Sequence, residues 1–248
     1  MRPLSRSLST SHSGSTLVRA LQVIGAVMFV ISLAAGARAY VQRFDAVAPS
    51  GTSPWPPLAI DIALFSMFAL HHSLLARAHL KGRLRAKVGV DAERALYVML
   101  ASVLFFACMH LWAPLPGTWY ALTDAWWWVG ASVQGAGVVV TLLAARTLSV
   151  RELMGLERPR QAEPPDQAPA LETRGLYRLV RHPIYLGWLL CVGGAPLMTS
   201  TRLAFAVISV VYLVIAIPYE ERSLIDNFGD PYVAYRRQVR WRMLPGVY

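Results

Sequence analysis

Cysteine and charged residues, which would point to particular classes of protein, are both scarce in this sequence. The 248 residues include only two cysteines, Cys108 and Cys191, which lie inside apolar segments and form no CxxC pair. Thiols in such places usually act as small apolar side chains, so we predict neither a disulfide framework nor a metal site. Charged residues make up 15% of the chain, against about 25% in a typical soluble domain. The sequence therefore argues against a soluble globular protein.

Apolar residues, by contrast, are abundant and gathered in runs. Hydrophobic residues account for 55% of the chain, and the mean hydropathy is +0.42. Runs of roughly 15 to 20 mostly apolar residues approach the length of a helix that crosses a bilayer. We expect spans near 17–37, 57–75, 95–112 and 126–145, followed by a tight helical hairpin of 183–198 and 203–219, turned at 199–202.

These runs predict an all-α integral membrane protein with about five to six transmembrane helices, the last two forming the hairpin. Four full spans plus a re-entrant hairpin are an alternative. Residues 1–16 are expected to be a disordered cytoplasmic tail and 17–145 a four-helix transmembrane region. Residues 146–248 are expected to face the cytoplasm and to hold the helical hairpin and a C-terminal tail, which lies at the interface from residue 220 onward. Ala37-Arg38-Ala39 resembles a signal-peptidase site, so a cleaved first span is a further alternative.

The chain is strongly basic, with 24 Lys and Arg against 14 Asp and Glu. No nucleic-acid motif accompanies this charge, so we do not expect a nucleic-acid partner. Instead, 21 of the 24 basic residues fall in the N-terminal tail, the 77–94 loop, the 146–181 segment and the C-terminal tail. Basic loops stay on the cytoplasmic side of a bacterial inner membrane, so we expect both termini in the cytoplasm. The expected partner is therefore the lipid bilayer of that membrane.

Polar residues that could carry chemistry stand at both ends of the predicted hairpin. Arg181 and His182 precede Pro183 at its start, and Glu220-Glu221 close it. Pro183 suits the first turn of a helix, which puts His182 near the N-cap, where N–H groups and the helix dipole favour an anion. Two adjacent carboxylates at the mouth of an apolar segment need cationic or hydrogen-bonding partners. They point in different directions on a helix, so one could face a pocket while the other contacts the basic tail.

Taken singly, each element has a plainer explanation. The arginine, histidine and aromatic residues could be an interfacial anchor, and the acidic pair could be a cap or a surface ion pair. Together they form a longer pattern: the run 174–187 (RGLYRLVRHPIYLG), Glu220-Glu221, then Phe228-Gly229-x-x-Tyr232-x-x-Tyr235, and Leu244-Pro245-Gly246. This pattern resembles the membrane methyltransferases related to isoprenylcysteine carboxyl methyltransferase and the phospholipid N-methyltransferases. The resemblance covers about the last third of the chain.

Shorter motifs suggest a particular branch. The segments 68–77 (FALHHSLLAR), 93–97 (ERALY) and 195–199 (APLMT) are similar to the bacterial methanethiol S-methyltransferases and to a related family linked to nitrite and nitric-oxide reduction. The resemblance implies S-adenosylmethionine as methyl donor. It also implies, by position, a cofactor cavity lined by Tyr177, Arg181, His182, Tyr185, Gly187, Glu220 and Glu221, with Tyr235 and Arg236 as candidate catalytic residues.

The acceptor is indicated by a departure from the family pattern. Isoprenylcysteine enzymes are expected to carry an arginine just upstream of the acidic pair, where this chain has the stretch 213–219 (LVIAIPY). This favours a small neutral thiol or another lipid-soluble acceptor, unless Arg236 or Arg237 substitutes. A prenylated cysteine or a phospholipid headgroup is the alternative acceptor within the same fold.

A non-catalytic accessory protein of haem or nitrogen-oxide metabolism is the alternative from another class. The acidic pair and the His182-Pro183 element argue against it, because a protein without a cofactor has no evident need for them. Histidines inside spans can bind haem or a metal. However, His71 and His72 are expected near the cytoplasmic end and His110 near the opposite end, so one shared site is not expected.

Overall fold

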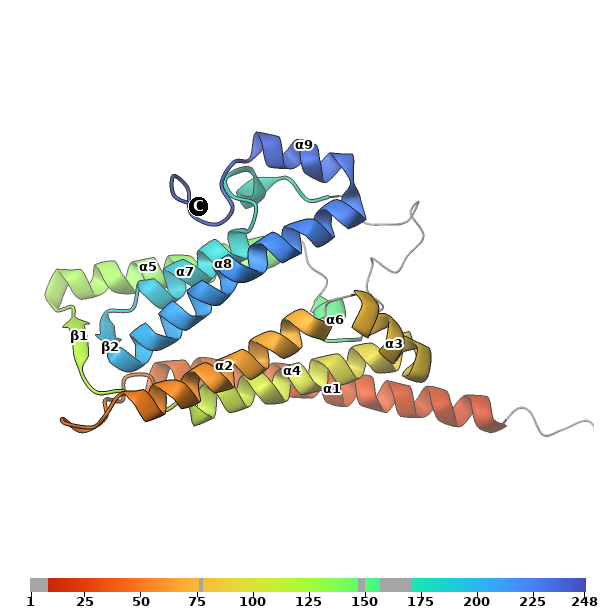
Figure 1. The fold of residues 1–248 in the computed structure, drawn as a ribbon, viewed down its shortest axis with the longest axis horizontal. Helices are drawn as coiled ribbons and strands as arrows, with labels where there is room; N and C mark the ends of the chain where they lie inside the picture. Colours follow the sequence, from red (N-terminus) through yellow and green to blue (C-terminus); the bar gives the residue numbers. More distant parts are fainter. Residues whose placement is uncertain (1–8, 76–77, 147–149, 157–170) are drawn as a thin grey trace, which may run out of the picture.

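The protein is built of two layers of helices that lie side by side (Figure 1). The computed structural model describes residues 9–75, 78–146, 150–156 and 171–248. One layer holds α1 (Ser9–Gln42), α2 (Trp55–Leu75), α3 (Ala78–Val88) and α4 (Val90–Leu111). The other holds α5 (Asp124–Ala145), α7 (Pro183–Gly193) and α8 (Ser200–Phe228). Shorter elements complete the described chain: β1 (Thr118–Ala121), α6 (Val150–Leu153), the 3₁₀ helix η2 (Gly175–Arg178), β2 (Leu197–Thr199) and α9 (Asp230–Gln238).

Four of the described helices are long and apolar enough to cross a membrane. They are Thr16–Gln42 within α1, Val90–Leu111, Asp124–Ala145 and Ser200–Phe228. Helix α2 has a similar length of 21 residues, although Asp61, His71 and His72 interrupt its apolar sequence. The helices support the predicted all-helical membrane architecture, to which the structure adds a small two-stranded sheet. The number of five to six crossings stays a prediction.

The C-terminal hairpin differs from the one predicted. Its first arm, α7, has 11 residues and is only about 16 Å long at 1.5 Å per residue, which is too short to cross about 30 Å of hydrocarbon. The helix ends at Gly193 because Gly194 and Pro196 follow, and Leu197–Thr199 pair with β1 instead. The second arm is longer than predicted. Helix α8 runs through Pro218 and the acidic pair to Phe228, so the helix that carries Glu220 and Glu221 is continuous with the second arm.

The N-terminal boundary also moves. Helix α1 begins at Ser9, inside the segment predicted as a disordered tail, and residues 1–8 lie outside the described residues. The helix continues to Gln42, so Ala37-Arg38-Ala39 lies within it, and cleavage of the first span stays an untested alternative. Parts of the predicted polar stretch 146–181, namely 147–149 and 157–170, likewise lie outside the described residues.

Aromatic side chains join the two layers around Phe205 of α8. The Phe205 ring centroid lies 4.9 Å from that of Phe44 and 5.1 Å from that of Trp112, both from the first layer. On the other side it lies 5.7 Å from the ring of Trp188 on α7. Such edge-to-face contacts add about 0.5 to 1.5 kcal/mol per pair beyond the burial of their area. Phe205 therefore couples α7 and α8 to the first layer.

Hydroxyl groups at the start of α8 fix the same end of the protein. Thr199 is the N-cap of α8: its side chain accepts a hydrogen bond from the Arg202 N–H and donates to the Phe44 carbonyl at 2.7 Å. Thr201 donates to the Ala46 carbonyl at 2.9 Å. Arg202 forms an ion pair with Asp45 at 2.8 Å. The loop after α1 is thus held against α8 by side chains rather than by a sheet.

Small residues allow α5 and α7 to pack closely. A Cβ added at Gly137 would overlap the backbone of Cys191 and of Gly187. One added at Gly187 would overlap Thr141 and the Gly137 carbonyl. Small residues at helix contacts are typical of membrane proteins, where close backbone approach replaces the hydrophobic drive between helices. Gly187, predicted as a cofactor residue, is therefore placed at a helix contact.

We predict that Gly137→Ala destabilises the protein by about 1 to 3 kcal/mol, because the added methyl group overfills the α5–α7 contact. Gly135→Ala is the matched control, since it lies on the same helix and a Cβ there meets nothing within 4 Å. It should leave stability unchanged or raise it slightly through helix propensity. Unfolding in detergent micelles, followed by tryptophan fluorescence, measures both. Equal stability of the two variants would contradict the packing described.

Candidate functional site

The site begins at the first turn of α7. His182 is the N-cap residue and Pro183 occupies the first turn, which confirms the positions predicted for both. The backbone N–H groups of Arg181 and His182 donate to the carbonyls of Trp241 at 2.9 Å and Arg242 at 2.8 Å. The segment after α9 therefore lies across the start of α7 and covers it.

Glu221 is buried beneath this segment and meets several cations. Its side chain is 3% exposed. One oxygen accepts from the Nε of Arg181 at 2.6 Å, and the other accepts from the Nε of Arg242 at 3.3 Å. The Nε2 of His182 lies 3.5 Å from the first oxygen, and the Nε of Arg236 lies 3.9 Å from the second. Glu221 thus has the cationic partners that a buried carboxylate requires.

Arg181 extends this pair into the C-terminal segment. Its side chain is 6% exposed, and its Nη1 donates to the carbonyls of Val239 at 2.7 Å and Arg240 at 2.8 Å. The guanidinium therefore binds α8 through Glu221 and the segment after α9 through two carbonyls. This arrangement explains why an arginine, with donors in a fixed planar fork, stands before the helix.

Glu220 points the other way and remains accessible. Its side chain is 42% exposed, and one oxygen accepts from the Tyr185 hydroxyl at 2.7 Å. The Nδ1 of His182 lies 3.6 Å from the same oxygen. The rings of His182 and Tyr185 stack with centroids 5.4 Å apart and planes within 6°. The predicted divergence of the two carboxylates is confirmed: Glu221 faces the basic tail, and Glu220 faces the open side.

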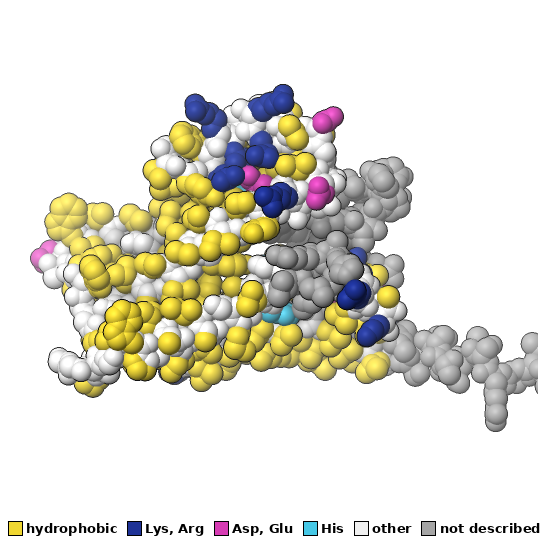
Figure 2. All heavy atoms as spheres, in the orientation of Figure 1, with side chains coloured by type: hydrophobic (Ala, Val, Ile, Leu, Met, Phe, Trp, Pro, Cys, Tyr) yellow, Lys and Arg dark blue, Asp and Glu magenta, His cyan; other side chains and the backbone are white. Residues whose placement is uncertain are grey.

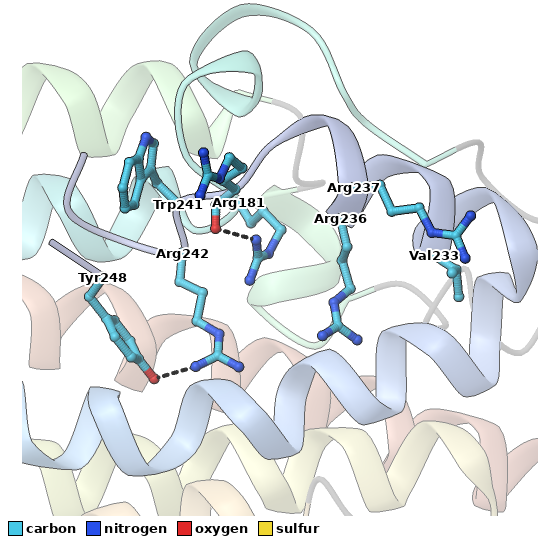
Figure 3. A pocket seen from close by; sticks show the side chains of 8 residues that line it. Arg181, Val233, Arg236, Arg237, Trp241, Arg242 and Tyr248 are labelled. Carbon is cyan, nitrogen blue, oxygen red and sulfur yellow. Dashed lines mark hydrogen bonds between the residues drawn. The ribbon is translucent and has the colours of Figure 1, made fainter. Parts of the chain in front are cut away.

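A basic cavity lies next to the buried pair, between α9 and the segment that follows it (Figure 3). Its volume of about 660 Å³ falls within the range of about 300 to 1,000 Å³ that is usual for small-molecule sites. The lining residues are Arg181, Val233, Arg236, Arg237, Arg240, Trp241, Arg242 and Tyr248. A smaller cavity of about 220 Å³ beside Glu221 shares Arg236 and Arg242 with it. In Figure 2 dark blue side chains gather on this part of the surface, above a largely apolar body.

The tyrosines of α9 are packed rather than open to the cavity. The buried Tyr235 hydroxyl donates to the Tyr177 carbonyl at 2.7 Å and so holds η2 against α9. Burial raises the pKa of Tyr235 above its ordinary value, and burial raises the pKa of Tyr232 to about 12. Both hydroxyls stay protonated near neutral pH. A catalytic role for Tyr235 stays a prediction, whereas Arg236 does line the cavity.

Several residues of the site were not singled out from the sequence. Trp241, Arg242 and Tyr248 come from the C-terminal segment, and Arg242 donates both to Glu221 and to the Tyr248 hydroxyl, the latter at 2.9 Å. The arginine-rich tail was the available signal, but it did not distinguish Arg242 from its neighbours. The residues placed around the acidic pair as predicted are Arg181, His182 and Tyr185.

The histidines of the N-terminal layer have local partners. His71 and His72 both contact Tyr97 of α4, and His110 contacts the Phe106 carbonyl one turn earlier on its own helix. Among the residues that the structure describes, no three His, Cys, Asp or Glu side chains gather in a way that could hold a metal ion.

The amino-acid sequence is similar to those of known membrane methyltransferases. The sequence model of the phospholipid methyltransferase family matches residues 126–231. Methanethiol S-methyltransferase 1 of Bradyrhizobium diazoefficiens is 34% identical over 76% of this chain and 67% of its own length. The methanethiol S-methyltransferase of Pseudomonas deceptionensis is 34% identical over 75% of this chain and 72% of its own.

The chain belongs to this family of membrane methyltransferases. The matched region contains most of α5, all of α7 and α8, and the acidic pair, but of the residues that line the larger cavity it contains only Arg181. A Nurim homolog of Drosophila melanogaster is also similar, at 24% identity over 90% of this chain and 93% of its own. No solved structure matches the chain significantly.

We predict that Glu221→Gln destabilises the protein by about 3 to 5 kcal/mol, because it leaves the buried Arg181 guanidinium without its counter-charge. Glu220→Gln is the matched neighbour, and its accessible carboxylate should contribute about 1 kcal/mol or less. The midpoint of unfolding in detergent micelles distinguishes the two. A larger loss for Glu220→Gln than for Glu221→Gln would contradict the roles assigned to the pair.

Proposed function

We propose that this membrane methyltransferase uses S-adenosylmethionine to methylate a small thiol, at a site open to the cytoplasm. The observation that carries the proposal is an arginine-lined cavity beside the acidic pair, in which Glu221 is buried and Glu220 stays accessible, at one end of apolar helices. The names of the relatives, methanethiol S-methyltransferases, point to methyl transfer and to a thiol acceptor.

The polar groups of the site suit the donor. S-adenosylmethionine combines a carboxylate, an ammonium group, a ribose diol and a sulfonium, and when bound it supplies an electrophilic methyl group. Arg236 and Arg237 line the cavity, and Arg236 is 3.9 Å from Glu221. Arg181 and Arg242 instead donate hydrogen bonds to Glu221 at 2.6 and 3.3 Å. Arg236 and Arg237 are therefore the arginines best suited to the donor's carboxylate. Glu220, held by Tyr185, suits the ammonium group or the ribose hydroxyls.

The acceptor side supports a small neutral thiol. The stretch 213–219 of α8 is apolar except for Tyr219, with Leu213 and Ile217 buried and Val214 and Ile215 exposed on the helix surface. Such a surface offers no charge to bind a carboxylate acceptor, whereas an uncharged thiol can dissolve in the bilayer and reach the site between helices. Methyl displacement then depends on proximity, alignment and exclusion of water.

The charge distribution supports an orientation with this site and both termini on the cytoplasmic side. The basic residues of α3, η2, α9 and the C-terminal segment lie toward one end of the long helices, as the dark blue side chains in Figure 2 indicate. The positive-inside rule places that end in the cytoplasm of a bacterial cell.

A phospholipid headgroup is the second candidate acceptor. The family model that matches residues 126–231 is described as phospholipid methyltransferase, which favours it. The higher similarity over most of the chain to methanethiol S-methyltransferases favours the thiol. Incubating the purified protein with either an alkanethiol or phosphatidylethanolamine vesicles compares the two acceptors directly.

We expect detergent-purified protein to bind S-adenosylmethionine saturably, and Glu220→Gln to weaken binding by about tenfold or more, since a hydrogen bond to a charged group contributes about 1.5 to 3 kcal/mol. Asp226→Asn is the control, because this exposed carboxylate stands on the same helix beyond the acidic pair. Isothermal titration calorimetry measures all three proteins. Absence of saturable binding by folded wild-type protein would overturn the proposed donor.

A further inference from the structure

A second polar cluster lies where the N-terminal layer meets α8, outside the arginine-lined cavity. The Tyr97 hydroxyl on α4 lies 2.8 Å from the Nδ1 of His72 on α2. One residue further along α2, the Ser73 hydroxyl lies 3.0 Å from the Tyr212 hydroxyl on α8. These two contacts join three helices of the two layers. All four side chains are polar, and none is an arginine, lysine or carboxylate.

The cluster adjoins the accessible carboxylate of the site. Glu220 is close enough to His72 and to Tyr212 for its charge to act on both side chains. Glu220 is also the acceptor of the Tyr185 hydroxyl. The site thus has two different sides. Arginines lie on the side of α9 and the C-terminal segment, and histidine, serine and tyrosine lie on the side of α2 and α4.

His72 is the one side chain of this cluster with a basic nitrogen. The residue is exposed, and its Nδ1 meets the Tyr97 hydroxyl. When Nδ1 carries the hydrogen and donates it to the Tyr97 oxygen, the lone pair of Nε2 is available. Among the described residues no hydrogen-bond partner of Nε2 is found. The charged or titratable groups that act on the ring are Glu220, His71 and Arg94, the last stacked on Tyr97 at 5.4 Å.

We propose that His72 is the proton acceptor for the thiol substrate and that Tyr97 positions its ring. This rests on the proposed function. The S–H bond of the thiol breaks and its proton passes to Nε2 of His72. The sulfur electron pair forms the new S–CH₃ bond as the bond from that methyl carbon to the donor's sulfonium breaks, and its electrons stay on the donor sulfur. The imidazolium then returns the proton to water.

The first test compares two acceptors with different acidity in His72→Asn. The amide of asparagine can still meet the Tyr97 hydroxyl, but it has no basic nitrogen. For an alkanethiol, which is protonated near neutral pH, we expect kcat/KM to fall by about 100-fold or more, the usual contribution of a general base. For 4-nitrothiophenol, which is already ionised, we expect a change of less than about threefold, because no proton has to be removed. For Tyr97→Phe we also expect kcat/KM to fall with the alkanethiol and not with 4-nitrothiophenol, but by less than in His72→Asn.

A second measurement is independent of methyl transfer. Thiophenol is titrated by absorbance in the presence of the protein without donor, because its thiolate and thiol forms absorb differently. A neighbouring imidazole stabilises a thiolate, so the apparent pKa of bound thiophenol should be about one unit lower with wild-type protein than with His72→Asn. The control is His110→Asn, whose Nδ1 meets the Phe106 carbonyl on its own helix and which should match the wild type in both tests.

Two results would overturn the assignment. Equal loss with both acceptors, accompanied by identical thiophenol titrations, would make His72 a structural residue only. Full alkanethiol activity in His72→Asn would exclude it as the proton acceptor. If instead the wild type binds the donor but methylates no thiol, both the proposed thiol acceptor and the role of His72 are wrong. Either of the two results above would remove only the role of His72 and would leave the proposed function unchanged.

Discussion

The buried ion pair between Arg181 and Glu221 determines the arrangement of the site. It joins the start of α7 to α8, and the remaining donors of Arg181 bind the backbone at Val239 and Arg240. Three segments far apart in sequence are therefore held by one guanidinium. Because an uncompensated charge would be strongly unfavourable in this place, the three segments have little freedom to separate. The accessible Glu220 and the arginine-lined cavity take their positions from this pair.

The parts of the site that could be predicted from the sequence depend on local geometry. Proline is tolerated in the first turn of a helix, which placed His182 at the N-cap. Consecutive residues on a helix point about 100° apart, which placed Glu220 and Glu221 on different sides. The long apolar helices followed from runs of apolar residues, and the family followed from several motifs at fixed spacing.

What could not be predicted depends on contacts between distant segments. The early end of α7 follows Gly193 and Gly194, but the strand after it forms because β1 lies beside it. Gly187 belongs to a motif that suggested a cofactor contact, yet the neighbouring helix α5 places it at a tight packing contact. Arg242 and Tyr97 acquire their roles only because the C-terminal segment folds back over α7 and α4 lies against α2. No spacing in the sequence records those juxtapositions.

In the proposed reaction, arginines bind an anionic group of the donor, and polar residues of α2 and α4 meet an acceptor that arrives from the bilayer. The central claim is that a methyl group passes from S-adenosylmethionine to a small thiol. The most direct measurement is incubation of the purified protein with methyl-labelled S-adenosylmethionine and methanethiol, with the volatile product identified by mass spectrometry. We expect labelled dimethyl sulfide that accumulates with time and protein concentration. Unlabelled or absent product from a protein that binds the donor would contradict the account.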